Sequence, residues 1–179
     1  MGETRLLTFE LNEASSEHVL HDGNVTRRPR SFFLDWVVDG ASLREQLVGA
    51  DSLVTPLNRP WLPHVSESVD ALTGRTPGID LAPGRVGILL CVVCGDVEVS
   101  AALELHTTTV VWSDLHWEGA EPDFPVEGAP AVLTFERAGY EEALEEAYER
   151  VARLPYEASE HTTRRFLWPW QWGWRLPRS

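Results

Sequence analysis

The chain has 179 residues, of which 43% are hydrophobic, and this length and composition suit a single domain with a buried core. Its 28 acidic residues and 15 arginines give a net charge of -13, and lysine is absent. An acidic surface repels phosphate groups, so the charge argues against sequence-independent binding of nucleic acid and against attraction to anionic lipid. A basic protein partner is favoured instead.

The compartment is inferred from the N-terminus and from the cysteines. The first residues have neither the basic start nor the apolar length of a secretory leader, and no apolar run approaches the roughly 20 residues that a membrane-spanning helix needs. We therefore expect a cytoplasmic protein that does not enter a membrane. In that reducing compartment the only two cysteines, Cys91 and Cys94, are expected to be thiols or metal ligands rather than a disulfide.

Two strands are expected near the N-terminus. Residues 6–11 form a short apolar run, and residues 31–39 form a longer one that is rich in aromatic and branched side chains. The segment 13–30 between them is polar. Its arginine cluster, Arg27-Arg28-Pro29-Arg30, is interpreted most simply as part of a solvated loop.

Two short helices are expected to follow. Ser42 and Glu45 form a capping-box pattern at the start of a helix over 43–48, which Gly49 would end. A second helix is expected over 63–73, because apolar residues recur there three and four residues apart before a glycine: Leu62, Val65, Val69, Leu72 and Gly74.

The middle of the chain has the pattern of a sheet. Three β-rich runs over 86–94, 97–106 and 108–117 are joined by very short connections, which predicts an antiparallel meander. A loop with several prolines follows. Residues 131–136 then predict a further strand.

The last regular element is expected to be a helix from Tyr140 to Leu154. Apolar residues recur there at helical spacing, and glutamates occupy the other side. The sequence therefore predicts a single α+β domain over residues 1–179. It would contain an antiparallel sheet of five or six strands, a C-terminal amphipathic helix packed on one face and short N-terminal helices.

Residues 160–179 form a tryptophan-rich tail. Four of the eight tryptophans are spaced two residues apart, so an extended chain would place them on one side: Trp168, Trp170, Trp172 and Trp174. The favoured interpretation is that these indoles cover an apolar face of the domain. A strip that binds a partner and a segment that binds a membrane surface are the alternatives, and the acidity of the domain opposes the second of these.

Cys91 and Cys94 have the spacing of half a tetrahedral zinc site. The missing ligands would come from His106 and His116, which are ten residues apart across a predicted hairpin, from Asp96, or from the same cysteine pair of a second subunit. A redox dithiol has the same spacing, but the residues that follow are predicted as strand and not as the helix N-terminus that lowers a thiol pKa. A buried structural pair of thiols is the leading interpretation, and a zinc or thiol site is the alternative.

A possible acid–base pair lies at Asp114 and His116, which would share one face of a strand so that the carboxylate orients the imidazole. Ser113 would point to the opposite face. The chain also has no Gly-x-Ser-x-Gly elbow, no Rossmann fingerprint and no His-Glu-x-x-His motif. We identify no catalytic signature and name no reaction.

A Cys-x-x-Cys-Gly-Asp segment at 91–96 is followed by the strand motif Val-Val-Trp-Ser-Asp at 110–114. On these residues the stretch 85–117 resembles an uncharacterised family of small actinobacterial proteins. Val99 stands where that family has a third cysteine, and a hydrophobic side chain cannot ligate zinc. The resemblance implies no established activity.

We therefore expect a noncatalytic binding or protein-interaction module with a basic protein partner. An immunity-type or antitoxin-like role is one concrete form of this hypothesis. The alternative is a protein with a zinc or thiol site at Cys91 and Cys94.

Overall fold

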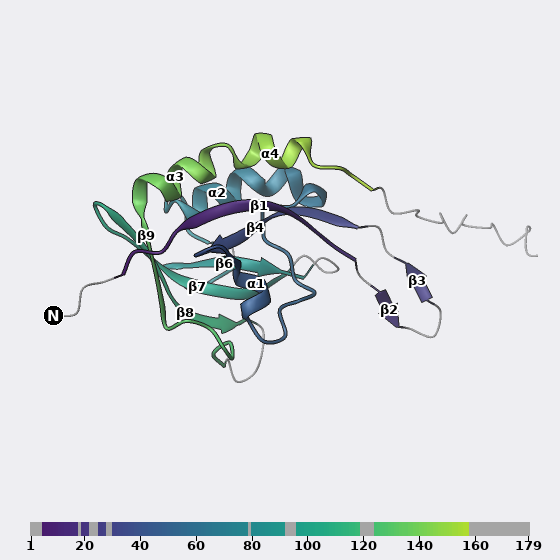
Figure 1. The fold of residues 1–179 in the computed structure, drawn as a ribbon, viewed down its shortest axis with the longest axis horizontal. Coiled ribbons are helices and arrows are strands. Elements are labelled where there is room, and N and C mark those ends of the chain that lie inside the picture. The colour runs from purple at the N-terminus through teal and green to yellow at the C-terminus, as the bar shows by residue number, and fades with distance from the viewer. Residues whose placement is uncertain are drawn as a thin grey trace, which may run out of the picture.

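A computed structural model describes residues 5–17, 19–21, 25–27, 30–78, 80–91, 96–118 and 124–157 of the chain. Over these ranges the chain has an α+β fold, with two main antiparallel sheets and several short helices (Figure 1).

The first sheet has three strands in the order β1-β4-β5. β1 (Phe9–Ser16) and β4 (Ser31–Val38) pair along their whole length, and β5 (Ala41–Ser42) pairs with the end of β4. Between β1 and β4 the chain forms a separate small hairpin of β2 (Val19–His21) and β3 (Val25–Arg27). The predicted strand over 31–39 is thus confirmed, and it is buried along almost its whole length.

The second sheet is the predicted meander with a fourth strand added. Its order is β6-β7-β8-β9, formed by β6 (Arg85–Leu90), β7 (Val97–Leu105), β8 (Thr109–Trp117) and β9 (Val132–Glu136). All three pairings are antiparallel.

Short bridges join the two sheets at both margins. Leu7, which precedes β1, pairs with Phe135 of β9. On the other margin Val54 pairs with Leu90 of β6, and the backbone N–H of Leu34 in β4 donates to the carbonyl of Leu57 at 2.9 Å. The strands therefore surround a common core. The expected sheet of five or six strands is instead divided between sheets of three and four strands.

Aromatic side chains from both sheets meet in this core. Trp36 of β4 and Trp112 of β8 are fully buried, and their rings meet edge to face with centroids 5.5 Å apart. Trp36 Nε1 also donates to the carbonyl oxygen of Ile88 in β6 at 2.7 Å. The core needs both sheets because large rings project into it from each, and this contact ties one sheet to the other.

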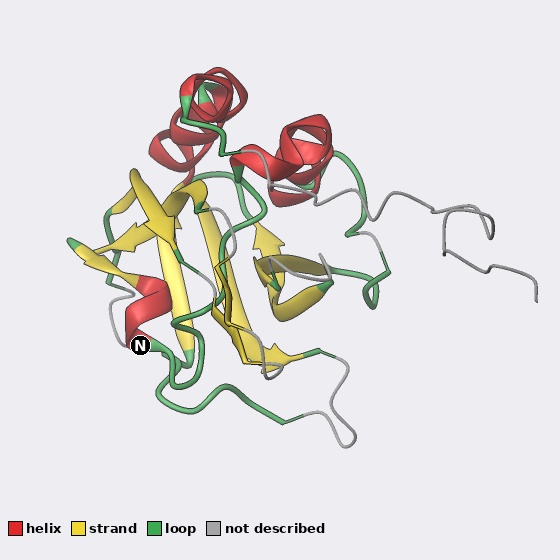
Figure 2. Ribbon diagram, turned by 90° about the vertical axis from the view of Figure 1, so that its right-hand side faces the viewer, coloured by secondary structure: helices red, strands yellow, loops and turns green. Residues whose placement is uncertain are grey.

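The helices are short: α2, α3 and α4 lie together on one side of the strands, and α1 lies apart from them (Figures 1 and 2). α1 (Leu43–Gln46) begins at Ser42, whose Oγ accepts from Glu45 N at 3.3 Å, as the capping pattern predicts. The 3-10 helix η1 (Arg59–His64) runs into α2 (Val65–Leu72). In the part of the chain that the structure describes, no helix is long and apolar enough to cross a membrane.

The expected C-terminal helix is two helices, α3 (Arg137–Glu145) and α4 (Ala147–Arg153), separated at Glu146. α3 starts directly after β9 because the side chain of Glu136 accepts from Gly139 N and caps it. Most of the predicted apolar stripe continues across the break and is buried, whereas its Tyr148 is exposed and its Ala143 is partly buried; the buried members are Tyr140, Leu144, Ala147, Val151 and Leu154. The Tyr140 hydroxyl donates to the carbonyl of Leu72 at 3.0 Å and so connects α3 with α2.

Candidate functional site

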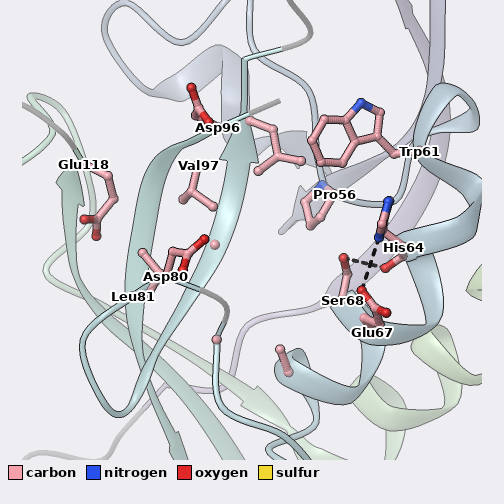
Figure 3. Close-up of a pocket in the computed structure, with 14 residues that line it drawn as sticks. Pro56, Trp61, His64, Glu67, Ser68, Asp80, Leu81, Asp96, Val97 and Glu118 are labelled. Atoms are coloured by element: carbon pink, nitrogen blue, oxygen red, sulfur yellow. Dashed lines mark hydrogen bonds and ion pairs between the residues drawn. The ribbon is translucent and has the colours of Figure 1, made fainter. Parts of the chain in front are cut away.

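A cleft of about 630 Å³ lies between a helical wall and a sheet wall (Figure 3). The helical wall is made by η1 and α2, and the sheet wall by β6, the start of β7 and the end of β8. The lining residues that carry functional groups are Trp61, His64, Glu67, Ser68, Asp80, Asp96 and Glu118. The sequence patterns did not predict this site, because its residues come from elements far apart in the chain.

Trp61 is positioned by the start of η1. The Asn58 side chain accepts from Trp61 N at 3.1 Å and donates to the carbonyl of Thr55 at 2.8 Å. Asn58 is itself buried, so it fixes the turn that carries Trp61. The indole of Trp61 is only partly buried and borders the cleft (Figure 3).

His64 and Glu67 form an ion pair on the same helical wall. His64 Nδ1 lies 3.2 Å from Glu67 Oε2, and the side chains are both 59% exposed. Ser68 Oγ donates to the carbonyl of His64 at 3.0 Å (Figure 3). An exposed pair of this kind contributes little to stability, so both side chains are available to a ligand.

The sheet wall is shaped by Gly87 and Val97. A Cβ atom added at Gly87 would lie 2.8 Å from Val97 Cγ2. The absence of a side chain at Gly87 therefore lets Val97 lie flat against β6 and form part of the cleft floor.

A buried polar network holds Glu118 at the edge of the cleft. Arg85 Nε donates to Ser100 Oγ at 2.8 Å, and Ser100 Oγ donates to Glu118 Oε1. Ser100 is fully buried and Arg85 is 9% exposed. A buried guanidinium is costly unless it is paired, so this arrangement restrains both Arg85 and Glu118.

Asp114 and His116 complete the network. Arg85 Nη1 donates to Asp114 Oδ2 at 2.7 Å, and His116 lies between the two carboxylates, 3.2 Å from Glu118 Oε1 and 3.6 Å from Asp114 Oδ2. Asp114 has a φ of 49° at a bulge in the β7–β8 pairing. The structure therefore brings together the two residues that strand alternation placed on one face.

This network does not have the geometry of a nucleophile and its base. Ser100 pairs with His116 across the strands, but its hydroxyl donates to Glu118 and is fully buried. Sequence reasoning missed Arg85 and Ser100. An arginine at the start of an otherwise apolar strand was the available signal for a buried charge.

No family model, curated protein or solved structure matches this chain. Functional inference therefore depends on the chemistry of the cleft itself.

The cleft is strongly acidic. The fourteen described residues that line it include four carboxylates and no arginine: the acids are Glu67, Asp80, Asp96 and Glu118. Among the residues that the structure describes, Asp80 and Asp96 have no side-chain partner. Carboxylates of this kind attract a cation, and the face of an indole stabilises one that lies over it.

The structure does not gather the four candidate zinc ligands. Cys91 follows β6 and its N–H donates to the carbonyl of Asp96, at the end of the sheet that also holds His116. His106 follows β7 at the opposite end, about 20 Å away along the strand, where its Nε2 lies 3.4 Å from Glu104 Oε2. His106 and His116 of one chain therefore cannot bind the same ion.

Cys94 lies outside the described residues, so the cysteine pair stays a prediction. In the described part of the chain, no group of three or more potential ligands is close enough to hold a metal ion. Elemental analysis of the wild type and of Cys94→Ser would test the pair directly.

The predicted interaction residues Trp168, Trp170, Trp172 and Trp174 also lie outside the described residues.

Proposed function

We propose that the protein is a cytoplasmic, noncatalytic binding module whose acidic cleft binds a cationic segment of a partner protein. The observation that supports this proposal is a concave site whose described lining residues include four carboxylates and one tryptophan but no arginine. A guanidinium or ammonium group over an indole gains about 0.5–1 kcal/mol when exposed and about 2 when desolvated. An immunity-type or antitoxin-like role, in which a small acidic protein binds a basic one, is one concrete form of the proposal.

The walls of the cleft are held in place before any ligand arrives. Glu118 is restrained by its contacts with Ser100 and His116, and Trp61 is restrained by the Asn58 cap. A site that needs little ordering loses less conformational entropy on binding. The volume also falls within the range of about 300–1,000 Å³ that ligand sites commonly have.

The test is the binding of a fluorescein-labelled peptide of alternating arginine and glycine, measured by fluorescence anisotropy at about 0.15 M salt, where the screening length is about 8 Å. Asp80→Asn with Asp96→Asn should weaken binding about tenfold, since each lost contact with a charged group is worth somewhat under 1 kcal/mol at a partly exposed site. Trp61→Ala should weaken it further by removing the aromatic face.

The matched control is Glu142→Gln with Glu145→Gln. These two exposed acids lie on α3 outside the cleft, and their neutralisation changes the net charge by the same amount. The control variant should bind the peptide within about twofold of the wild type, because long-range charge is screened. Equal losses in the two double variants would show attraction by net charge alone and would contradict the proposal.

A further inference from the structure

The C-terminal tail is basic, whereas the rest of the chain is acidic. Residues 158–179 contain four arginines and one glutamate, a net charge of +3, whereas residues 1–157 contain 27 acidic and 11 basic residues, a net charge of -16. The tail also carries the four tryptophans of 168–174. It therefore combines guanidinium groups with aromatic rings, the two groups that an acidic cleft bordered by Trp61 can bind.

The described chain ends beside the helical wall of the cleft. After α4, the carbonyl of Leu154 accepts from Arg59 Nε at 3.2 Å, and the Arg59 guanidinium lies 5.8 Å from the ring centroid of Tyr156. Glu157 Oε2 accepts from Arg30 N at 2.9 Å. Arg59 is the first residue of η1, the helix that carries Trp61.

We propose that the chain's own tail, residues 158–179, occupies the acidic cleft and competes there with a basic partner. This inference rests on the cleft being a site for cations, as proposed above. Arg164 is the seventh residue after Glu157, and seven residue steps of extended chain span roughly 23 Å. η1, which forms the near wall, is only about 12 Å long. The linker to the first arginine of the tail is therefore longer than the helix that forms this wall.

Tethering favours this occupant over a free one. A segment joined by a short linker has an effective concentration on the order of millimolar at its site. A partner segment of equal intrinsic affinity must exceed that concentration to displace the tail. The cleft would then bind only a partner whose segment has a higher affinity for it than the tail has, or a partner that also binds the tail.

The test uses the full-length protein with four tail arginines replaced, Arg164→Gln, Arg165→Gln, Arg175→Gln and Arg178→Gln, called here the tail variant. The labelled arginine–glycine peptide should bind the tail variant at least tenfold more tightly than the wild type. This gain should disappear when Asp80→Asn and Asp96→Asn are added, and should persist when Glu142→Gln and Glu145→Gln are added. A gain that persists in both backgrounds would come from net charge and would overturn the inference.

A direct readout is fluorine NMR of protein labelled with 5-fluorotryptophan, with the Trp61 signal assigned by its loss in Trp61→Phe. The Trp61 signal should shift between the wild type and the tail variant, and the shift should not depend on protein concentration. A shift that grows with concentration would assign the tail to a second copy and overturn binding within one chain.

The outcomes separate the two proposals. Equal peptide affinity in the wild type and the tail variant, with loss in Asp80→Asn/Asp96→Asn, would overturn the tail inference and leave the cleft as a cation site. Absence of peptide binding in the tail variant would overturn the proposed function, and the tail inference with it.

Discussion

Asp35 is the buried carboxylate of the first sheet, and its contacts all come from neighbours in the chain. Its Oδ2 accepts from Ser42 Oγ at 2.6 Å, and its Oδ1 accepts from Trp36 N at 3.0 Å. Arg44 Nε lies 3.9 Å from Oδ2. Burial raises the pKa of Asp35 above its ordinary value of 3.8, although the hydrogen bonds and the arginine act in the opposite direction. The single residue therefore links the end of β4 to the start of α1 at an electrostatic cost.

The raised pKa predicts how Asp35 affects stability as the pH changes. The folded protein binds a proton at Asp35 more tightly than the unfolded chain does, so the free energy of unfolding falls as the pH rises from 3.8 through the raised pKa. Above that pKa the penalty is constant. Asp35→Asn removes this titration. The free energy of unfolding of the wild type should therefore fall, relative to that of the variant, as the pH rises through this range.

Urea unfolding of both proteins at a series of pH values measures that difference, and the other carboxylates cancel in it. The exposed Asp51 provides the control, since Asp51→Asn should give a difference from the wild type without this trend. A difference that does not vary with pH, or that favours the wild type at higher pH, would contradict the assignment.

At the scale of elements, the end of α2 depends on one glycine. Gly74 has a φ of 69°, and its N–H donates to the carbonyl of Ala71 at 3.0 Å. A Cβ atom at this position would lie 2.3 Å from Leu105 Cδ1. Gly84 provides a comparison, because its φ is 80° but a Cβ there would meet nothing within 4 Å.

Gly84→Ala should therefore lower the free energy of unfolding by about 1–2 kcal/mol, the cost of a left-handed backbone for an ordinary residue. Gly74→Ala should cost more, because Leu105 must also move. Both are measured by urea unfolding monitored by circular dichroism. Equal losses in the two variants would mean that Leu105 adapts freely and that the backbone alone requires the glycine.

Local patterns predicted those elements whose signals are local. The Ser42 cap, the glycine after α2 and the meander of β6 to β8 all depend on residues a few positions apart. The division into two sheets depends instead on contacts such as Leu7 with Phe135 and Val54 with Leu90. Single bridges of this kind leave no periodic pattern in the sequence, so strand pairing across the core could not be predicted.

The cleft was missed for the same reason. Glu67 lies on α2, Asp80 in a loop, Asp96 at the start of β7 and Glu118 at the end of β8. Each is an ordinary exposed acid when the sequence is considered alone. Only the packing of α2 against the second sheet places them around one cleft.

At the scale of the whole molecule, the cleft concentrates charge of one sign in a protein that already carries a net charge of -13. Carboxylates that line one cleft without a cation repel and oppose folding, whereas a bound cation removes that cost. The tail arginines, if they occupy the cleft, supply that cation within the same chain. Stability and occupancy of the cleft are therefore coupled.

This coupling predicts different responses to the same substitutions in the two backgrounds. In the tail variant, Asp80→Asn with Asp96→Asn should raise the free energy of unfolding by about 0.5–1 kcal/mol, because repulsion in an empty cleft is relieved. In the wild type the same pair should give a smaller gain or a loss, since the favourable contacts with the tail are removed together with the repulsion. The Glu142→Gln/Glu145→Gln control should change both backgrounds alike.

Urea unfolding of the four proteins at low and high salt measures the coupling as a double-mutant cycle. Raising the ionic strength from about 0.01 M to 1 M shortens the screening length from roughly 30 to 3 Å, so the coupling should shrink as salt is added. If Asp80→Asn with Asp96→Asn raises the free energy of unfolding equally in the wild type and in the tail variant, the tail does not contact these two acids. The acids would then have no partner in the tail, and their cost to folding would be offset only when a separate partner binds.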